Sequence, residues 1–405
     1  MGTETAVGFF RHGVEILLSR NEGVSPSPWW TVSVSVEDGR AGSVPERLTS
    51  IAGRPDATLL RRVEPLPAGD DTDRRIRPFL FECDTRDVTV GPPDAVHEWT
   101  QPPALFDRDT EPWLWDAYLA VAPSVRTVRE DTDHGAAFLS LRALEVLRDR
   151  AASVAEDGGT YELVADTARQ LRSARPSMGV IGVRIDRVMT SAERTPESVR
   201  ERAIAACADA VDADRRAAKR VASLLGDHVL TLSRSGTVES ALEVADPRSV
   251  LVAESRPDRE GVDTAERLSA AGIDVTVLTD AAIEGILADG EADTVLVGAD
   301  TVLADGGVVN KVGTRTAMRA ATESGADGYV VCSRDKIVPE TTFDPEPGPP
   351  EAIYAGGADL AVHNPTFERA PPEVVPAIVT EADVYTPDGI EPIARKHASY
   401  RRWDD

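Results

Sequence analysis

The stretch that decides the fold is Asp293–Thr314, which reads Asp-Thr-Val-Leu-Val-Gly-Ala-Asp-Thr-Val-Leu-Ala-Asp-Gly-Gly-Val-Val-Asn-Lys-Val-Gly-Thr. The pattern predicts a buried strand over its first five residues, a Gly-Ala-Asp turn ending in Asp300, and a helix that begins with Asn310 and Lys311. Ligands of open α/β sheets bind where strands end and helices begin, so these three side chains are predicted to line one crevice. An acid, an amide and a cation suit an oxygen-rich ligand. The alternative is a strand–turn–helix with ordinary turn residues.

Residues 227–405 alternate strands and helices at the spacing of an α/β domain. Near-continuous apolar runs are typical of parallel strands that are buried on both faces. The predicted strands are His228–Leu232, Ser249–Ala253, Asp274–Leu278, Asp293–Val297 and Gly328–Cys332. Helical segments between them predict a doubly wound, Rossmann-like parallel sheet.

Residues 132–226 are predicted to form a helical subdomain. Apolar residues recur there at helical spacing, and Pro196 is suited to a first helical position. The predicted helices are Ala137–Ala151, Tyr161–Leu171, Val180–Met189 and Pro196–Leu225.

Residues 1–125 are predicted to form a separate α+β domain. Two strands flank the His12-Gly13 turn, further strands follow, and a short helix is predicted to end at Gly53. This order resembles the Nudix fold, whose working helix holds Mg²⁺ with clustered glutamates. Here Ser50 and Ile51 stand at the paired metal carboxylates, after Glu46-Arg47. We therefore expect a degenerate Nudix-like domain without a metal or hydrolase activity; binding, sensing, oligomerisation and an inert spacer all remain open as roles.

Composition restricts the environment and the partners. The 405 residues carry a formal charge of −25, spread along the chain. Abundant acid with scarce lysine is typical of proteins that stay soluble in concentrated salt, so we expect a halophilic cytoplasm. Such a surface disfavours direct nucleic-acid or membrane binding. Neither a signal peptide nor a long apolar run is present, and no cofactor is predicted. The few lysines are Lys219, Lys311, Lys336 and Lys396, and the thiols, expected to be reduced, are Cys83, Cys207 and Cys332.

Several motifs together carry a family resemblance over roughly residues 132–400. The Gly-Ala-Asp turn, the Asp305-Gly306 turn and Asn-Lys-x-Gly-Thr occur in the family's order, joined by Glu254–Pro257 and Asn364–Glu373. The chain resembles the family of translation initiation factor 2B regulatory subunits, methylthioribose-1-phosphate isomerase and ribose-1,5-bisphosphate isomerase.

The resemblance and the local pattern together suggest the substrate-binding residues. Relatives present Arg-Gly-Ala and Arg-Pro-Ser loops to a phosphate; the matching residues here include Gly135, Ala136 and Arg175, while His134 replaces the first arginine. Lys336 would donate to ring or phosphate oxygens, unless it is an ordinary loop lysine. At a predicted helix start, main-chain N–H groups suit a phosphate, although simple helix capping is the alternative. That helix start contains Ser235, Gly236 and Thr237.

The same resemblance implies two catalytic positions. Isomerases of the family convert an aldose 1-phosphate to a ketose with a cysteine that moves the proton and an aspartate that acts on oxygen. Asp300 matches the aspartate, but Ser233 occupies the cysteine's position. A thiol with a pKa of about 8.5 can ionise in a tuned site, whereas a serine alkoxide needs an adjacent base, which neither Leu232 nor Arg234 supplies. Cys332, at the end of a neighbouring strand, is a remote alternative.

Three functions follow in order of preference. The first is a non-catalytic protein, like the regulatory subunits, that binds a phosphosugar or nucleoside monophosphate. It would form a homo-oligomer, a dimer or hexamer, with a translation factor as a candidate partner. The second is a phosphosugar aldose–ketose isomerase that uses Asp300. Nudix hydrolysis ranks third, because the metal carboxylates are missing.

Overall fold

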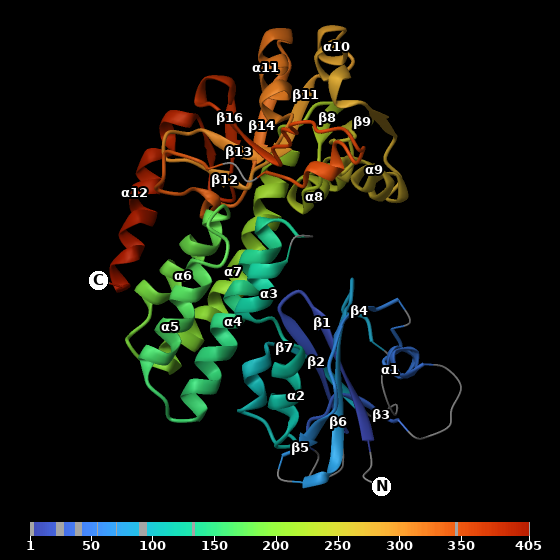
Figure 1. Cartoon of the computed structure of the whole chain (residues 1–405), viewed down its shortest axis with the longest axis vertical. Coiled ribbons are helices and arrows are strands. Elements are labelled where there is room, and N and C mark those ends of the chain that lie inside the picture. The colour runs from blue at the N-terminus through green and yellow to red at the C-terminus, as the bar shows by residue number, and fades with distance from the viewer. Residues whose placement is uncertain are drawn as a thin grey trace. The chain divides into compact units, whose positions relative to one another are not determined.

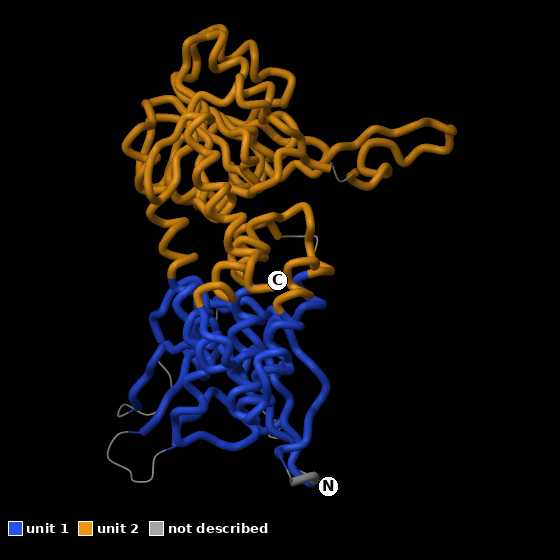
Figure 2. Tube along the Cα trace, turned by 90° about the vertical axis from the view of Figure 1, so that its left-hand side faces the viewer, with its two compact units in different colours: residues 1–128, 142–167, 192–208 blue, residues 129–141, 168–191, 209–405 orange. Residues whose placement is uncertain are grey.

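The computed structural model describes residues 4–21, 28–36, 43–54, 56–69, 71–88, 95–131, 134–344 and 347–404. The chain forms two compact units, coloured separately in Figure 2. Unit 1 comprises Met1–Val128, Arg142–Thr167 and Ala192–Ala208, and unit 2 comprises Arg129–Leu141, Ala168–Ser191 and Asp209–Asp405. The predicted boundary at residue 132 lies outside the described residues, and the three-domain division remains a prediction.

Unit 1 is built on a seven-stranded mixed sheet. Its strands are β1 (Glu4–His12), β2 (Glu15–Asn21), β3 (Val32–Ser35), β4 (Thr58–Arg62), β5 (Leu66–Ala68), β6 (Asp71–Glu82) and β7 (Ala95–Thr100). The main path is β4-β6-β1-β2-β7, in which β1 and β6 are parallel and the other pairs are antiparallel. The two strands predicted around His12-Gly13 are confirmed as β1 and β2.

Each face of this sheet is covered by one short helix because β1 alternates its apolar side chains. Val7 and Phe9 pack with helix α2 (Leu114–Val121), while Ala6 and Phe10 pack toward helix α1 (Val44–Ile51). Ser43 is the N-cap of α1. Its side chain accepts from the main-chain N–H of Glu46, and the Glu46 carboxylate accepts from the main-chain N–H of Ser43. Glu46 therefore caps the helix.

A buried ionic cluster joins the sheet to the helical part of unit 1. Arg148, on helix α4 (Ala136–Glu156), is fully buried and lies 2.7 Å from Asp149. Its guanidinium also donates to the Val14 carbonyl and to Gln101, each at 3.1 Å. The hydroxyl of Tyr118 donates to Asp149 at 2.9 Å. Residues distant in the sequence thus form one core.

Further helices precede the second sheet. They are α3 (Val125–Glu130), α5 (Tyr161–Arg172), α6 (Gly179–Ser191) and α7 (Pro196–Ala222). Helices α4, α5, α6 and α7 confirm the four predicted helices, with ends that differ by up to five residues, whereas no helix was predicted at α3.

Unit 2 contains a seven-stranded sheet in the order β10-β9-β8-β11-β14-β16-β17. Its strands are β8 (His228–Leu232), β9 (Ser249–Ala253), β10 (Val275–Leu278), β11 (Thr294–Gly298), β14 (Asp327–Val331), β16 (Ala377–Val379) and β17 (Val384–Tyr385). The first six are parallel, and in chain order they read 3-2-1-4-5-6, the Rossmann-like arrangement. The predicted α/β architecture is confirmed for this unit.

Helices cover both faces of that sheet. Buried residues of α8 (Gly236–Ala245) and α9 (Glu260–Ala270) pack on one face. Those of α10 (Ile283–Ala288), α11 (Thr314–Ser324) and α12 (Glu391–Ser399) pack on the other. Figure 1 shows α10 and α11 side by side, apart from α8 and α9. The strand order reverses between β8 and β11, so the loops after these two strands border the crevice in which such sheets bind ligands.

A second, three-stranded sheet corrects one prediction. It consists of β12 (Thr301–Val302), β13 (Val308–Lys311) and β15 (Phe367–Ala370). Asn310 and Lys311 lie in β13, opposite Glu368 and Phe367, so the prediction that they open a helix is wrong. The helix begins at Thr314, after Gly313 adopts a left-handed φ of 105°.

Candidate active site

The loop after β8 places Ser233 beside a carboxylate. Ser233 has a left-handed φ of 62°, and its main-chain N–H donates to the buried Ser255 hydroxyl at 2.7 Å. Its own hydroxyl donates to Oε2 of Glu260 at 3.1 Å. Glu260 is the first residue of α9, at the carboxyl end of the adjacent strand β9. Two neighbouring parallel strands therefore bring a hydroxyl and a carboxylate together.

Lys311 joins the same cluster from β13. Its Nζ lies 3.0 Å from Oε2 of Glu260 and 3.0 Å from Oδ2 of Asp258. The Lys311 side chain is only 4% exposed, whereas those of Glu260 and Asp258 are 27% and 48% exposed. A buried ammonium thus faces two carboxylates that reach solvent, which is a suitable surface for a polar ligand.

Asp300 follows β11, which pairs with β8 on the side opposite to β9. The main-chain N–H of Ala136 donates to its carboxylate, and Lys336, Lys311 and Glu260 all act on its charge. Although part of the residue reaches solvent, desolvation raises the pKa of Asp300 above its ordinary value, and the attraction of Lys336 only partly offsets this. A carboxyl group with a raised pKa is suited to donating as well as accepting a proton.

Lys336 is held in place by the surrounding main chain and by a buried ion pair. It is 6% exposed, and its ammonium donates to the Ala299 carbonyl. The neighbouring Asp335 accepts from Arg184 of α6 at 3.2 Å and is paired with Arg187. Despite its desolvation, the pKa of Asp335 is lowered by these two arginines. Lys336 is therefore a fixed cation next to Asp300 rather than an exposed loop lysine.

The loop before α4 connects Arg175 to the same region. The Arg175 guanidinium donates to the Asp131 carbonyl, and the carboxylate of Asp131 lies 2.9 Å from Nδ1 of His134. Gly135 and Ala136 follow directly, and the latter reaches Asp300. The structure thus brings both predicted phosphate loops of this subdomain close to the carboxyl end of β11, with Arg175 bound to main chain.

The two helix starts at the site differ. At α8, Ser235 is the N-cap and accepts from the main-chain N–H of Val238 at 3.5 Å; Gly236 and Thr237 begin the helix. At α11, Glu368 already accepts from the N–H groups of Gly313 and Arg315, at 2.7 and 2.9 Å. The start of α8 is therefore the better place for an anion, because the start of α11 is occupied by a carboxylate.

Two other residues do not point to ligand chemistry. The Asn310 side chain is buried and donates to the Thr314 hydroxyl at 2.9 Å, so it stabilises the turn before α11. Cys332 is fully buried, and burial raises the pKa of its thiol to about 12. A thiol that stays protonated cannot replace the missing cysteine.

Glu260 is the residue that the sequence analysis missed. It lies 27 residues after Ser233, and only the pairing of β8 with β9 brings the loops after them together. The motif Glu254–Pro257, which precedes it at the end of β9, was the available signal, because consecutive strands of a parallel sheet often lie side by side.

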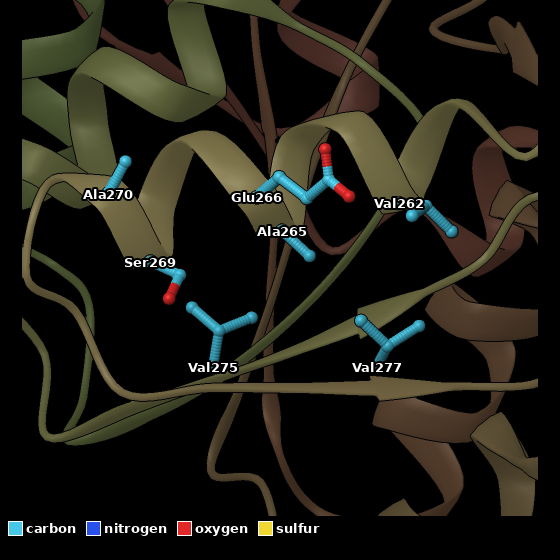
Figure 3. Close-up of a pocket in the computed structure, with 7 residues that line it drawn as sticks. All are labelled: Val262, Ala265, Glu266, Ser269, Ala270, Val275 and Val277. Carbon is cyan, nitrogen blue, oxygen red and sulfur yellow. The ribbon is translucent and has the colours of Figure 1, made fainter.

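A groove elsewhere in unit 2 is not a phosphate site. It has a volume of about 550 Å³ and lies between α9 and the edge strand β10 (Figure 3). Figure 3 shows an apolar lining with one carboxylate, Glu266, and one hydroxyl, Ser269. The groove lining has no lysine or arginine to offset this carboxylate, whereas Lys311 and Lys336 belong to the cluster around Ser233 and Asp300, so that cluster remains the candidate site.

The described part of the chain has neither a metal-binding cluster nor a membrane-spanning helix. There, no group of three or more His, Cys, Asp and Glu side chains could hold a metal ion. Nor is any helix of those residues long and apolar enough to cross a bilayer.

Comparisons with known proteins identify the family. The family model described as the initiation factor 2 subunit family matches residues 132–387. Ribose 1,5-bisphosphate isomerase of Haloferax volcanii is 34% identical over 303 residues, which cover 68% of this chain and 93% of that protein. Methylthioribose-1-phosphate isomerase of Gemmatimonas aurantiaca is 32% identical over 256 residues, covering 56% and 72%.

A solved structure agrees with these matches. The Pyrococcus horikoshii OT3 translation initiation factor eIF-2B superposes with a TM-score of 0.56 at 25% identity, covering 65% of this chain and 95% of that one. Residues 1–131 lie outside the matched family model. Over residues 132–387, the chain belongs to the initiation factor 2 subunit family.

Proposed function

We propose that the protein is an aldose–ketose isomerase that acts on a phosphorylated pentose, such as ribose 1,5-bisphosphate or a similar aldose 1-phosphate. The observation that carries this proposal is the setting of Asp300: a desolvated carboxyl group with a raised pKa, next to the fixed cation Lys336 and close to Lys311. The names of the similar isomerases support the same substrate class.

In this proposal the site divides binding from proton transfer. The start of α8, at Ser235, Gly236 and Thr237, accepts one phosphate with its main-chain N–H groups. Arg175, once released from the Asp131 carbonyl, supplies a bidentate contact to a second phosphate beside Gly135. Asp300 gives a proton to a sugar oxygen and takes one back, which is the task that its raised pKa suits.

One observation favours a second function. Ser233 stands where isomerases of this family are expected to carry a cysteine, so a non-catalytic protein that binds a phosphosugar or a nucleoside monophosphate is the other candidate. Such a protein would use the same cluster without turnover. The raised pKa of Asp300 and the contact between Ser233 and Glu260 favour the isomerase.

A turnover assay separates the two candidates. Purified full-length protein in molar salt is incubated with ribose 1,5-bisphosphate, and ketose formation is followed by NMR, with methylthioribose 1-phosphate and AMP compared in parallel. We expect ketose to form, and Asp300→Asn to lower turnover by about 10²–10⁴-fold while the substrate still raises the melting temperature. Binding without turnover of either sugar phosphate would refute the isomerase and support the regulatory protein.

The N-terminal region has a proposed role of its own. For residues 1–125 we propose a degenerate Nudix-like binding module. Two observations support this: Glu46 caps α1, and Ser50 and Ile51 stand where a Nudix helix would carry metal-binding carboxylates. Mg²⁺-dependent hydrolysis of a nucleoside diphosphate derivative by the full chain, lost in Glu46→Gln, would contradict this.

The environment and the assembly are also proposals. The charge of −25 supports a halophilic cytoplasm, and the family supports a homo-oligomer, a dimer or hexamer, with a translation factor as a candidate partner. Light scattering in molar potassium chloride measures the oligomeric state, and unfolding on dialysis into low salt is expected of a halophilic protein.

A further inference from the structure

We propose that Glu260 carries the proton between the two reacting sugar carbons, and that Ser233 is a positioning residue which holds the Glu260 carboxylate. This inference rests on the proposed isomerase function and deepens it. The proton transfer between carbons, which the family assigns to a cysteine, is thereby assigned to a residue in the connection after a different strand, β9. Glu260 then acts as the base and Asp300 as the acid.

The contacts fix Glu260 from two sides. The Ser233 hydroxyl donates to Oε2 of Glu260 at 3.1 Å, and Nζ of Lys311 approaches the same oxygen at 3.0 Å. Ser233 itself is held by the hydrogen bond from its N–H to Ser255. Both contacts use Oε2, so the proposal assigns Oε1 to the substrate. A carboxylate with one anchored oxygen is positioned for proton transfer.

The charges around the two carboxyl groups differ. Lys311, buried on β13, lies 3.0 Å from Oε2 of Glu260, and Asp258 shares the same ammonium. Desolvation and the negative charge of Glu260 both favour the protonated form of Asp300. Two carboxyl groups with such different environments are the usual basis for assigning a base and an acid.

The reaction then balances without any further reagent. Asp300 gives its proton to the ring oxygen as the bond from carbon 1 to that oxygen breaks. Glu260 takes the proton from carbon 2, and the electron pair of that C–H bond forms a double bond between carbons 1 and 2. The hydroxyl on carbon 2 returns a proton to Asp300 and becomes the ketone, while Glu260 delivers its proton to carbon 1. Both residues end in their starting states.

Alternative bases fit the geometry less well. Ser233 alone cannot ionise without a base, and the base it touches is Glu260 itself. The thiol of Cys332 is buried and has a pKa of about 12. Asp258 also forms an ion pair with Lys311, but its side chain is about half-exposed. A proton taken up there would exchange with water instead of returning to the sugar.

The decisive variants are Glu260→Gln and its matched control Glu266→Gln. Both lie on α9 and undergo the same chemical change, but Glu266 lines the groove against β10 (Figure 3). We expect Glu260→Gln to lower kcat by about 10²–10⁴-fold and Glu266→Gln to leave kcat within about twofold of the wild type. Ser233→Ala is expected to lose less than Glu260→Gln, and Glu260→Asp to recover part of the loss.

A pH profile distinguishes catalysis from structural support. Lys311 contacts Glu260 directly, Asp258 shares the Lys311 ammonium, and the charge of Glu260 acts on Asp300. A general base must be ionised to act, so the acid limb of the wild-type kcat profile reports the base, and the Gln variant is expected to lack that limb. Removing the negative charge of Glu260 also lowers the pKa of Asp300, which moves the alkaline fall of kcat to lower pH.

The outcomes separate this inference from the proposed function. Wild-type turnover together with full activity and an unchanged pH profile in Glu260→Gln would overturn the role of Glu260 and leave the isomerase standing. An equal loss in Glu266→Gln would also overturn it, because helix damage would then explain both variants. Absence of turnover in the wild type would refute the isomerase itself, and the inference with it.

Discussion

The substitution Gly261→Ala tests how α9 positions Glu260. Gly261 is the second residue of the helix, and a Cβ added to it would stand 1.9 Å from the Ala253 carbonyl oxygen. Real Cβ contacts below 3.0 Å essentially do not occur, and here the obstacle is the main chain of β9, not a flexible side chain. The first turn of α9 must therefore move by about 1.1 Å.

That displacement acts on both stability and rate. Overpacking of this kind costs about 1–3 kcal/mol. In a domain the size of unit 2, each kcal/mol lowers the melting temperature by about 2–4 °C. A shift of about 1 Å in the catalytic carboxylate also lowers the rate by about 100-fold. We expect both effects, because the residue that moves is next to Glu260.

Thermal unfolding in molar salt and the isomerase assay measure the two effects separately. The control is Gly285→Ala on α10, where an added Cβ meets nothing within 4 Å. That control is expected to unfold at the same or a slightly higher temperature, because alanine favours a helix interior. A Gly261→Ala protein with the melting temperature and kcat of the wild type would refute the inference that Gly261 lets the start of α9 pack against β9.

Two further predictions concern buried charge. The pKa of Asp300 is raised in the fold, so its ionisation opposes folding above the unfolded value of about 3.9. We therefore expect Asp300→Asn to melt at a higher temperature than the wild type at pH 7, and the difference to disappear toward pH 4. A lower melting temperature of the variant at pH 7 would contradict this. In unit 1, Arg148→Met leaves Asp149 buried without its ion pair, which should lower the unfolding free energy by about 3–5 kcal/mol. The control Arg150→Met, at an exposed position, should change the unfolding free energy by less than about 0.5 kcal/mol. Equal effects of the two variants in chemical denaturation would show that the ion pair contributes little.

The parallel strands could be predicted because their signal is local. β8 and β9 have the predicted bounds, His228–Leu232 and Ser249–Ala253, since strands buried on both faces need continuous apolar runs. The helix expected at Lys311 was wrong for the opposite reason. β13 exists because it pairs with β15, more than fifty residues later in the chain, and no local pattern reveals that pairing.

The candidate site shows the same division. Asp300 and Lys336 could be proposed from motifs, because each follows a recognisable strand. Glu260 could not, since its role depends on three elements meeting: β8 through Ser233, β9 through α9, and β13 through Lys311. The sequence contained the glutamate; the strand order was needed to give it a partner.

Replacing a thiol by a hydroxyl changes what its neighbour must do. A cysteine at position 233 would lie against Glu260, and that negative charge opposes formation of a thiolate. Ser233 has no such conflict, because its hydroxyl donates a hydrogen bond to Glu260 without itself carrying a charge. A carboxylate is a weaker base than a thiolate, yet almost all of it is ionised at neutral pH, whereas an unperturbed thiol is ionised only to a few per cent. The serine and the glutamate therefore form a consistent pair, and restoring the cysteine alone would weaken the site that it is meant to repair.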